Sequence, residues 1–137
     1  MSPERFPPDD PHEWLNRARS SLALAKAHPP ETYLEDLCFQ AQQAVEKAIK
    51  ALLIKQGVAF PYVHDLAHLL TILEDAGERV PAAVREAEEL TRYAVVTRYP
   101  GFAEPVTEAQ YEEAVAIAEA VVQWVANRLS ELRRSPW

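Results

Sequence analysis

Apolar residues recur along the chain with the spacing of α-helices, and no stretch has the alternation typical of a β-strand. The clearest helical stretch runs from Thr32 to Gly57. Its apolar positions alternate in steps of four and three, which keeps them on one side of a helix: Leu34, Cys38, Ala41, Val45, Ala48 and Leu52. Thr32 and Glu35 have the spacing of a capping box, and Gly57 suits a helix C-terminus. We therefore expect one long helix here.

Further apolar residues widen this face to roughly half of the helix circumference, more than the ~100° of an ordinary surface helix. Such a helix must be packed on several sides. We expect the carboxylate of Glu46 to be solvated, because it belongs to the remaining narrow strip, which is polar and holds Asp36, Gln40, Gln43, Glu46, Lys47 and Lys50. Gln42 projects instead to the apolar flank, where an unpaired amide would cost ~1–3 kcal/mol. We therefore expect Gln42 to have a hydrogen-bond partner.

Four other segments also show helical spacing, and they span residues 11–27, 65–77, 81–96 and 107–132. Asp10 and Asp65 are suitable N-caps for the first two of these segments. Thr107 and Gln110 form a second capping box at the start of the last one. Short connections join the segments. The pattern predicts an all-α fold, an antiparallel up-and-down helical bundle of four long helices plus one short helix.

The chain of 137 residues has the size of one domain. We expect residues 1–10 to be a flexible, proline-rich tail, residues 11–133 to form a single helical bundle, and residues 134–137 to be a second tail. In the last helix, Ile117, Val121 and Trp124 stand beside the main apolar face and lead to Arg128. These residues either widen the core or contact another subunit.

Composition and charge exclude several classes of protein. The net charge of -7 argues against nonspecific binding to a polyanion. Cys38 is the single cysteine and lies on the apolar face, so we interpret it as a small buried hydrophobic residue and not as a nucleophile. The N-terminus lacks the apolar run of a signal peptide, and no apolar stretch approaches the ~20 residues of a membrane span. A cytoplasmic protein is expected.

Two histidines four residues apart, His64 and His68, have the spacing of metal ligands on a helix. An N-cap at Asp65 would place His64 before the helix, however, and no third ligand is evident. We therefore favour a helix-start motif over a metal site. The sequence also has no glycine-rich phosphate loop and no Ser–His–acid arrangement, so we expect no metal, no cofactor and no catalytic set.

The remaining candidates for chemistry are cationic and aromatic. Lys47 and Lys50 are neighbours on the polar strip, and a second group follows in the fourth segment, comprising Arg92, Arg98 and Tyr99. The helix dipole alone explains a cation at a helix C-terminus. Guanidinium and phenol groups around a loop could also hold a phosphate and stack a base.

Three sequence blocks together resemble the HEPN domain family of prokaryotes, in the type associated with nucleotidyltransferases. They are FQAQQAVEKAIKALLIKQG at 39–57, His-Asp-Leu at 64–66 and Thr-Arg-Tyr-Pro at 97–100, and the likeness covers about residues 12–132. The resemblance implies a bundle of four to five helices, usually a homodimer. It also implies a toxin–antitoxin or defence module with a minimal nucleotidyltransferase encoded nearby.

Many members of this family are ribonucleases whose active site is an arginine followed, after four to six residues, by a histidine. This chain departs from that motif, because its last histidine is His68 and none follows Arg92 or Arg98. Arg5 and His12 have a suitable spacing, but they straddle the proline-rich tail and we treat the match as chance. Acid–base help is worth 10²–10⁴-fold in typical cases, so ribonuclease activity is not assigned from the family.

The resemblance therefore leads to two hypotheses. The first is a non-catalytic HEPN protein that binds a nucleotide, an RNA or a nucleotidyltransferase. The resemblance carries over, as residues that line or support the binding groove, Glu46, Lys47, Lys50, His64, Asp65, Arg98, Tyr99 and Pro100. Together with the cationic group of the fourth segment, the expected nucleotide- or partner-binding residues are Lys47, Lys50, His64, Asp65, Arg92, Arg98 and Tyr99. The alternative is a divergent, metal-independent ribonuclease toxin that uses Arg98 with Tyr99 or His64.

Overall fold

The structure is a computed structural model that describes residues 2–94, 100–101 and 104–134. The described residues form helices and connecting segments, with no strand among them. The helices are α1 (Pro11–Ala27), α2 (Leu34–Lys55), α3 (Leu66–Asp75), α4 (Ala82–Arg85), the 3₁₀-helix η1 (Glu86–Tyr93) and α5 (Glu108–Arg134). The predicted all-α bundle is confirmed.

Three helices begin where the sequence predicts, because a side chain binds the first unpaired N–H groups. The carboxylate of Asp10 accepts from the backbone N–H of His12 at 2.9 Å. The carboxylate of Asp65 accepts from two N–H groups at the start of α3. At the start of α5, Gln110 accepts from the N–H of Thr107 at 2.9 Å while Thr107 Oγ1 accepts from the N–H of Gln110 at 3.1 Å. That reciprocal pair is the predicted capping box.

The predicted capping box at the start of α2 is wrong. The hydroxyl of Thr32 donates to the carbonyl of Pro29 at 2.6 Å, and the N-cap of α2 is Tyr33, which makes no side-chain capping bond. The backbone N–H of Thr32 also donates to the Pro29 carbonyl, at 3.4 Å, so Thr32 belongs to the turn before α2 and not to its cap. The other end of α2 agrees with the sequence, since Gly57 adopts a left-handed conformation with φ 70°.

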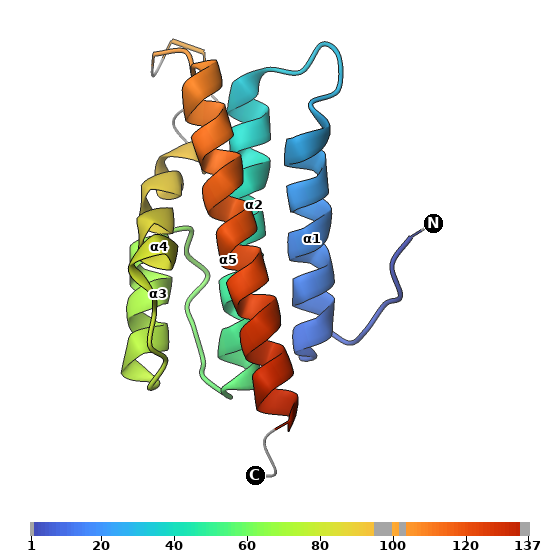
Figure 1. The fold of residues 1–137 in the computed structure, drawn as a ribbon, viewed down its shortest axis with the longest axis vertical. Coiled ribbons are helices and arrows are strands. Elements are labelled where there is room, and N and C mark those ends of the chain that lie inside the picture. Colours follow the sequence, from blue (N-terminus) through green and yellow to red (C-terminus); the bar gives the residue numbers. More distant parts are fainter. Residues whose placement is uncertain (1, 95–99, 102–103, 135–137) are drawn as a thin grey trace.

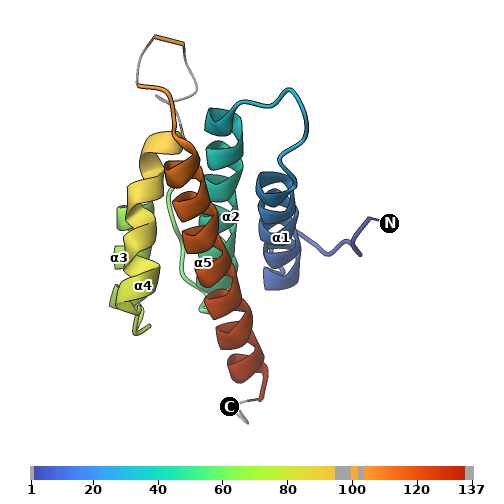
Figure 2. The same ribbon diagram turned by 45° about the horizontal axis from the view of Figure 1, so that its top comes forward.

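The bundle packs α1 antiparallel to α2, and α5 lies along both of them (Figure 1). Figure 2 shows α3 and α4 on the side of α2 and α5 away from α1. The connection between α2 and α3 departs from the simple up-and-down alternation of helix directions. Residues 56–65 return along α2 before α3 begins, so α3 runs in the same direction as α2 (Figure 1). His64 consequently lies beside Glu46, while Glu78, just after α3, lies beside Gln56.

The fourth segment is helical from Ala82 but only its first four residues are α-helical, and η1 forms the rest. The sequence predicted a continuous helix to about Val96, and residues 95–99 lie outside the described part. The predicted apolar face of this segment is nevertheless buried, at Val84, Ala87, Leu90 and Ala94. The apolar spacing therefore identified the buried face, although it did not distinguish a 3₁₀-helix from an α-helix.

The core forms between α2, α5 and the helices on either side of them. All five apolar residues from Ala48 to Leu53 are fully buried, which agrees with a helix packed on several sides. On α5, Val121 is fully buried, Ile117 is 8% exposed, and Trp124 packs partly buried against the core. This second group of apolar residues therefore widens the core of the chain. None of the described helices is long and apolar enough to cross a membrane.

Candidate functional site

Glu46 lies at the centre of a buried polar cluster formed by Gln42, Glu46, Lys50 and His64, which we call the Glu46 cluster. Three of its members are four residues apart on α2 and so share one face of the helix. The carboxylate of Glu46 accepts from Gln42 Nε2 at 3.0 Å and from Lys50 Nζ at 2.9 Å. His64 Nδ1 lies 2.8 Å from the same carboxylate. The predicted partner of Gln42 is thus present.

The environment of Glu46 favours its ionised form. Burial alone would raise the pKa of this carboxyl, but hydrogen bonds from His64, Lys50 and Gln42 outweigh burial and hold the pKa below its ordinary value. A carboxylate that remains charged makes Nδ1 of His64 the protonated nitrogen, because the carboxylate can only accept. The prediction that Glu46 is solvated is wrong: its side chain is 6% exposed.

Lys50 is also buried, although the sequence placed it on the polar strip of the helix. Its ammonium lies 5.9 Å from the ring centroid of Trp14 and 5.6 Å from that of Phe60, within the range of cation–π attraction. Trp14 comes from α1 and Phe60 from the segment that returns along α2. Both cover the polar strip from outside α2, which is why the pattern of α2 alone could not predict the burial of Lys50.

Lys47 points to α1, where its Nζ donates to Ser21 Oγ at 3.0 Å. Burial lowers the pKa of Lys47, and the nearby charge of Arg17 lowers it further. The two lysines predicted to bind a ligand are thus both engaged within the chain. Their contacts join α1, α2 and the returning segment.

His64 is the accessible member of the Glu46 cluster, with 59% of its side chain exposed. Asp65 follows it and caps α3, as predicted, by accepting from the N–H groups of Ala67 at 3.1 Å and His68 at 3.4 Å. Among the described residues, no group of three or more histidine, cysteine, aspartate or glutamate side chains is arranged to hold a metal ion.

The His64–Asp65 block and the Arg92 block lie close together in the fold. The backbone N–H of Leu66 donates to Thr91 Oγ1 at 3.0 Å, which ties the start of α3 to the last turn of η1. Arg92 stacks on Tyr93, with its guanidinium carbon 4.9 Å from the ring centroid and Nη2 2.7 Å from the phenol oxygen. The hydrogen bond to Tyr93 raises the pKa of Arg92 above its ordinary value.

Arg98 and Tyr99 lie outside the described residues, so their predicted place in the site is untested. Arg5 and His12 have the arginine–histidine spacing of the family's ribonucleases, but they do not line the same cavity. Arg5 lines one cavity with Arg17 and Ser20, whereas His12 lines another.

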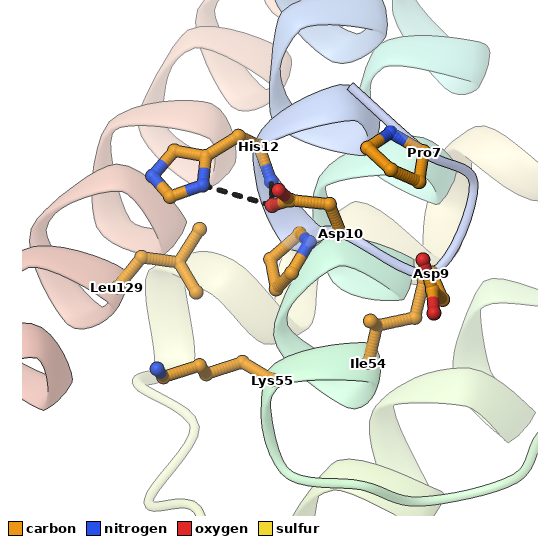
Figure 3. A pocket seen from close by; sticks show the side chains of 8 residues that line it. Pro7, Asp9, Asp10, His12, Ile54, Lys55 and Leu129 are labelled. Atoms are coloured by element: carbon orange, nitrogen blue, oxygen red, sulfur yellow. Dashed lines mark hydrogen bonds and ion pairs between the residues drawn. The ribbon is translucent and has the colours of Figure 1, made fainter.

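The cavity that contains His12 was missed by the sequence reasoning. It has a volume of about 450 Å³ and lies where α1 begins, α2 ends and α5 passes (Figure 3). Its lining includes Asp9, Asp10, His12, Ile54, Lys55 and Leu129. The predicted N-cap at Asp10 was a local signal for one wall of this cavity. The approach of Lys55 and Leu129 depends on packing between distant segments, which no local signal reports.

Comparison with known proteins identifies the family of this chain. Residues 11–129 match the model of the HEPN domain. A protein of Methanocaldococcus jannaschii named "Putative toxin MJ1304" is 26% identical over 132 residues, which cover 86% of this chain and 87% of that protein.

Two crystal structures also resemble the fold. ST0689, described as an archaeal HEPN homologue, superposes with a TM-score of 0.70 at 28% identity, over 87% of this chain and 97% of that one. TT1696 from Thermus thermophilus gives a TM-score of 0.70 at 29% identity, over 85% of this chain and 96% of that one. Because the HEPN model covers most of its length, this chain belongs to the HEPN domain family.

Proposed function

We propose that this protein is a non-catalytic HEPN partner protein in a toxin–antitoxin or defence-type module, acting in the cytoplasm as a homodimer. It binds a nucleotide, an RNA or a nucleotidyltransferase encoded nearby. The observation that carries the proposal is that His68 is the last histidine of this HEPN chain, so the arginine–histidine spacing of the family's ribonucleases does not occur after Arg92 or Arg98. The relative named as a toxin supports a role in such a module.

The proposed binding surface is the region around the end of η1, where Arg92 is exposed and the start of α3 is held against Thr91. Arg98 and Tyr99 are included as expectations from the sequence. Lys47 and Lys50 have a supporting role in this proposal, because Lys50 binds the carboxylate that also holds His64. A guanidinium group near an aromatic ring suits a phosphate or a nucleobase.

Two measurements test this proposal. The first is co-purification of the protein with the product of the adjacent reading frame, together with light scattering to establish the dimer. The second is a thermal shift of the protein with ATP and with a single-stranded RNA. Arg92→Ala and Arg98→Ala should abolish a shift that Arg79→Ala, a change at an exposed residue before Pro81, retains. A monomer at micromolar concentration with no shift and no co-purifying protein would refute the proposal.

The Glu46 cluster favours a second candidate, the metal-independent ribonuclease. His64 presents an exposed imidazole whose Nδ1 is bound by a buried carboxylate, which leaves Nε2 to accept a proton from a substrate hydroxyl. The test is cleavage of single-stranded RNA in the presence of a chelator. His64→Ala and Arg98→Ala must each abolish cleavage, while His68→Ala, at an exposed histidine on α3, must preserve it. Cleavage that survives both changes would rule out this mechanism.

A further inference from the structure

The 450 Å³ cavity beside His12 has walls fixed by hydrogen bonds. Residues 7–10 form a turn in which the N–H of Asp10 donates to the carbonyl of Pro7 at 2.9 Å. The indole Nε1 of Trp14 donates to the carbonyl of Pro8 at 2.6 Å, which fastens this turn to α1. The turn places Asp9 and Asp10 at the cavity, and the hydrogen bonds fix the backbone that carries both side chains.

The two carboxylates differ in what they can still bind. Asp10 Oδ1 already accepts from the N–H of His12 and lies 2.9 Å from His12 Nδ1, and these contacts lower the pKa of Asp10. Asp9 lines the same cavity and is exposed, and none of the described residues is hydrogen-bonded to its side chain. Asp9 is therefore the carboxylate with both oxygens available to a cationic group of a ligand.

Lys55 supplies the opposite charge. Its side chain lines the cavity, is exposed, and makes no ion pair within the described part of the chain, although its charge helps to lower the pKa of Asp10. Figure 3 shows Asp9 beside Ile54 on one side of the cavity and Lys55 below Leu129 on the other. The cavity thus offers a carboxylate and an ammonium that are separated by an apolar surface.

We propose that this cavity binds a short apolar peptide with free termini. The amino terminus of the peptide pairs with Asp9, its carboxylate pairs with Lys55, and its side chains lie on Ile54 and Leu129. Two or three extended residues span ~7–11 Å, so the termini of such a peptide can reach groups on different sides of a cavity of this size. Cavities of roughly 300–1,000 Å³ with apolar walls and a few polar groups are typical of ligand sites.

The test is isothermal titration calorimetry of the untagged full chain with leucyl-leucine. Two blocked probes, N-acetyl-leucyl-leucine and leucyl-leucine amide, each lack one terminal charge. We expect saturable binding of leucyl-leucine and a loss of roughly tenfold or more in affinity for each blocked probe, because each has lost a charge-assisted hydrogen bond.

Two variants locate the charges, Asp9→Asn and Lys55→Gln, and Glu112→Gln on the exposed face of α5 is the control. Asp9→Asn should weaken leucyl-leucine roughly tenfold without further weakening the acetylated probe. Lys55→Gln should also weaken leucyl-leucine roughly tenfold, without further weakening leucyl-leucine amide. Circular dichroism melting verifies that the variants fold. Equal binding of blocked and free peptides, no saturable binding, or equal loss in the Glu112→Gln control would overturn the proposal.

Discussion

Lys50 Nζ and Glu46 Oε2 are 2.9 Å apart in an ion pair whose two side chains are only 7% and 6% exposed. Removing one partner of a buried pair leaves a buried charge without compensation, at a cost of ~3–5 kcal/mol. We therefore expect Glu46→Met or Lys50→Met to lower the free energy of unfolding by about that amount. Urea unfolding followed by circular dichroism measures it.

The matched comparison is the double variant Glu46→Met/Lys50→Met, which should be more stable than either single variant because no lone charge remains. Asp36→Asn, at an exposed position of α2, should change the unfolding free energy by less than ~0.5 kcal/mol. Additive losses in the double variant would mean that the two side chains do not interact.

The lowered pKa of Glu46 makes part of the stability depend on pH. A carboxyl with a lower pKa in the folded chain stabilises the fold above its unfolded pKa, ~4.3 for glutamate, and this contribution is lost as the pH falls through the folded value. The gap in unfolding free energy between the wild type and Glu46→Gln should therefore be largest near neutral pH and narrow below about pH 4. Urea titrations over this range test it, and a constant gap would contradict the assignment.

Glu78 joins the end of α3 to α5 through a bidentate pair with Arg128, in which Nε donates to Oε2 at 2.9 Å and Nη2 to Oε1 at 3.0 Å. Lysine cannot reproduce this two-point geometry. We expect Arg128→Lys to cost ~1–2 kcal/mol of unfolding free energy in thermal or urea denaturation. Arg79→Lys is the exposed control, and an equal effect of the two changes would show that the paired geometry contributes nothing.

The N-terminal tail, for which the sequence predicts a flexible segment, makes three hydrogen bonds to side chains of α1. The N–H of Phe6 donates to the Glu13 carboxylate at 2.8 Å, Trp14 donates to Pro8, and Asn16 donates to the carbonyl of Glu4 at 3.1 Å. Deleting residues 1–8 removes all three bonds and should lower Tm by roughly 3–6 °C. Deleting residues 1–3 should change Tm little. The same small change for both deletions would mean that the tail does not stabilise the fold.

Cys38 is fully buried, and burial raises the pKa of its thiol to about 11. The reactive species is the thiolate, so the native protein should react with Ellman's reagent only as fast as it opens. We expect rapid reaction in denaturing urea and almost none in native buffer. Fast labelling of the native chain would show that the side of α2 bearing Cys38 is accessible.

Most helix ends were predictable because their signals lie within a few residues of sequence. Asp10, Asp65 and Thr107 each bind N–H groups two or three positions ahead, and Gly57 needs only its own left-handed backbone. Thr32 failed as a cap because an upstream carbonyl competed for its hydroxyl. Local rules work when no neighbouring group offers a competing bond.

The interior of the candidate site was not predictable from the periodicity of one helix. Lys50 lies on the polar strip of α2, and Trp14 and Phe60, from other parts of the chain, lie beside its ammonium. The same limit applies to Lys55 and His12, which are far apart in sequence and share a cavity. Gln42 was the exception, because an amide on an apolar flank requires a partner whatever the fold.

The course of α3 parallel to α2 determines where attachments to the chain emerge. An additional reversal between these helices brings the beginning of α1 and the last turns of α5 to one end of the molecule, where His12 and Leu129 meet (Figure 1). A fusion tag placed after α5 would therefore crowd that end and spare the end at which η1 finishes, whereas the N-terminal tail runs back along the side of α1 (Figure 1). Tagged protein suits assays on partners of the Arg92 region, whereas calorimetry at the opposite end requires that the tag be cleaved.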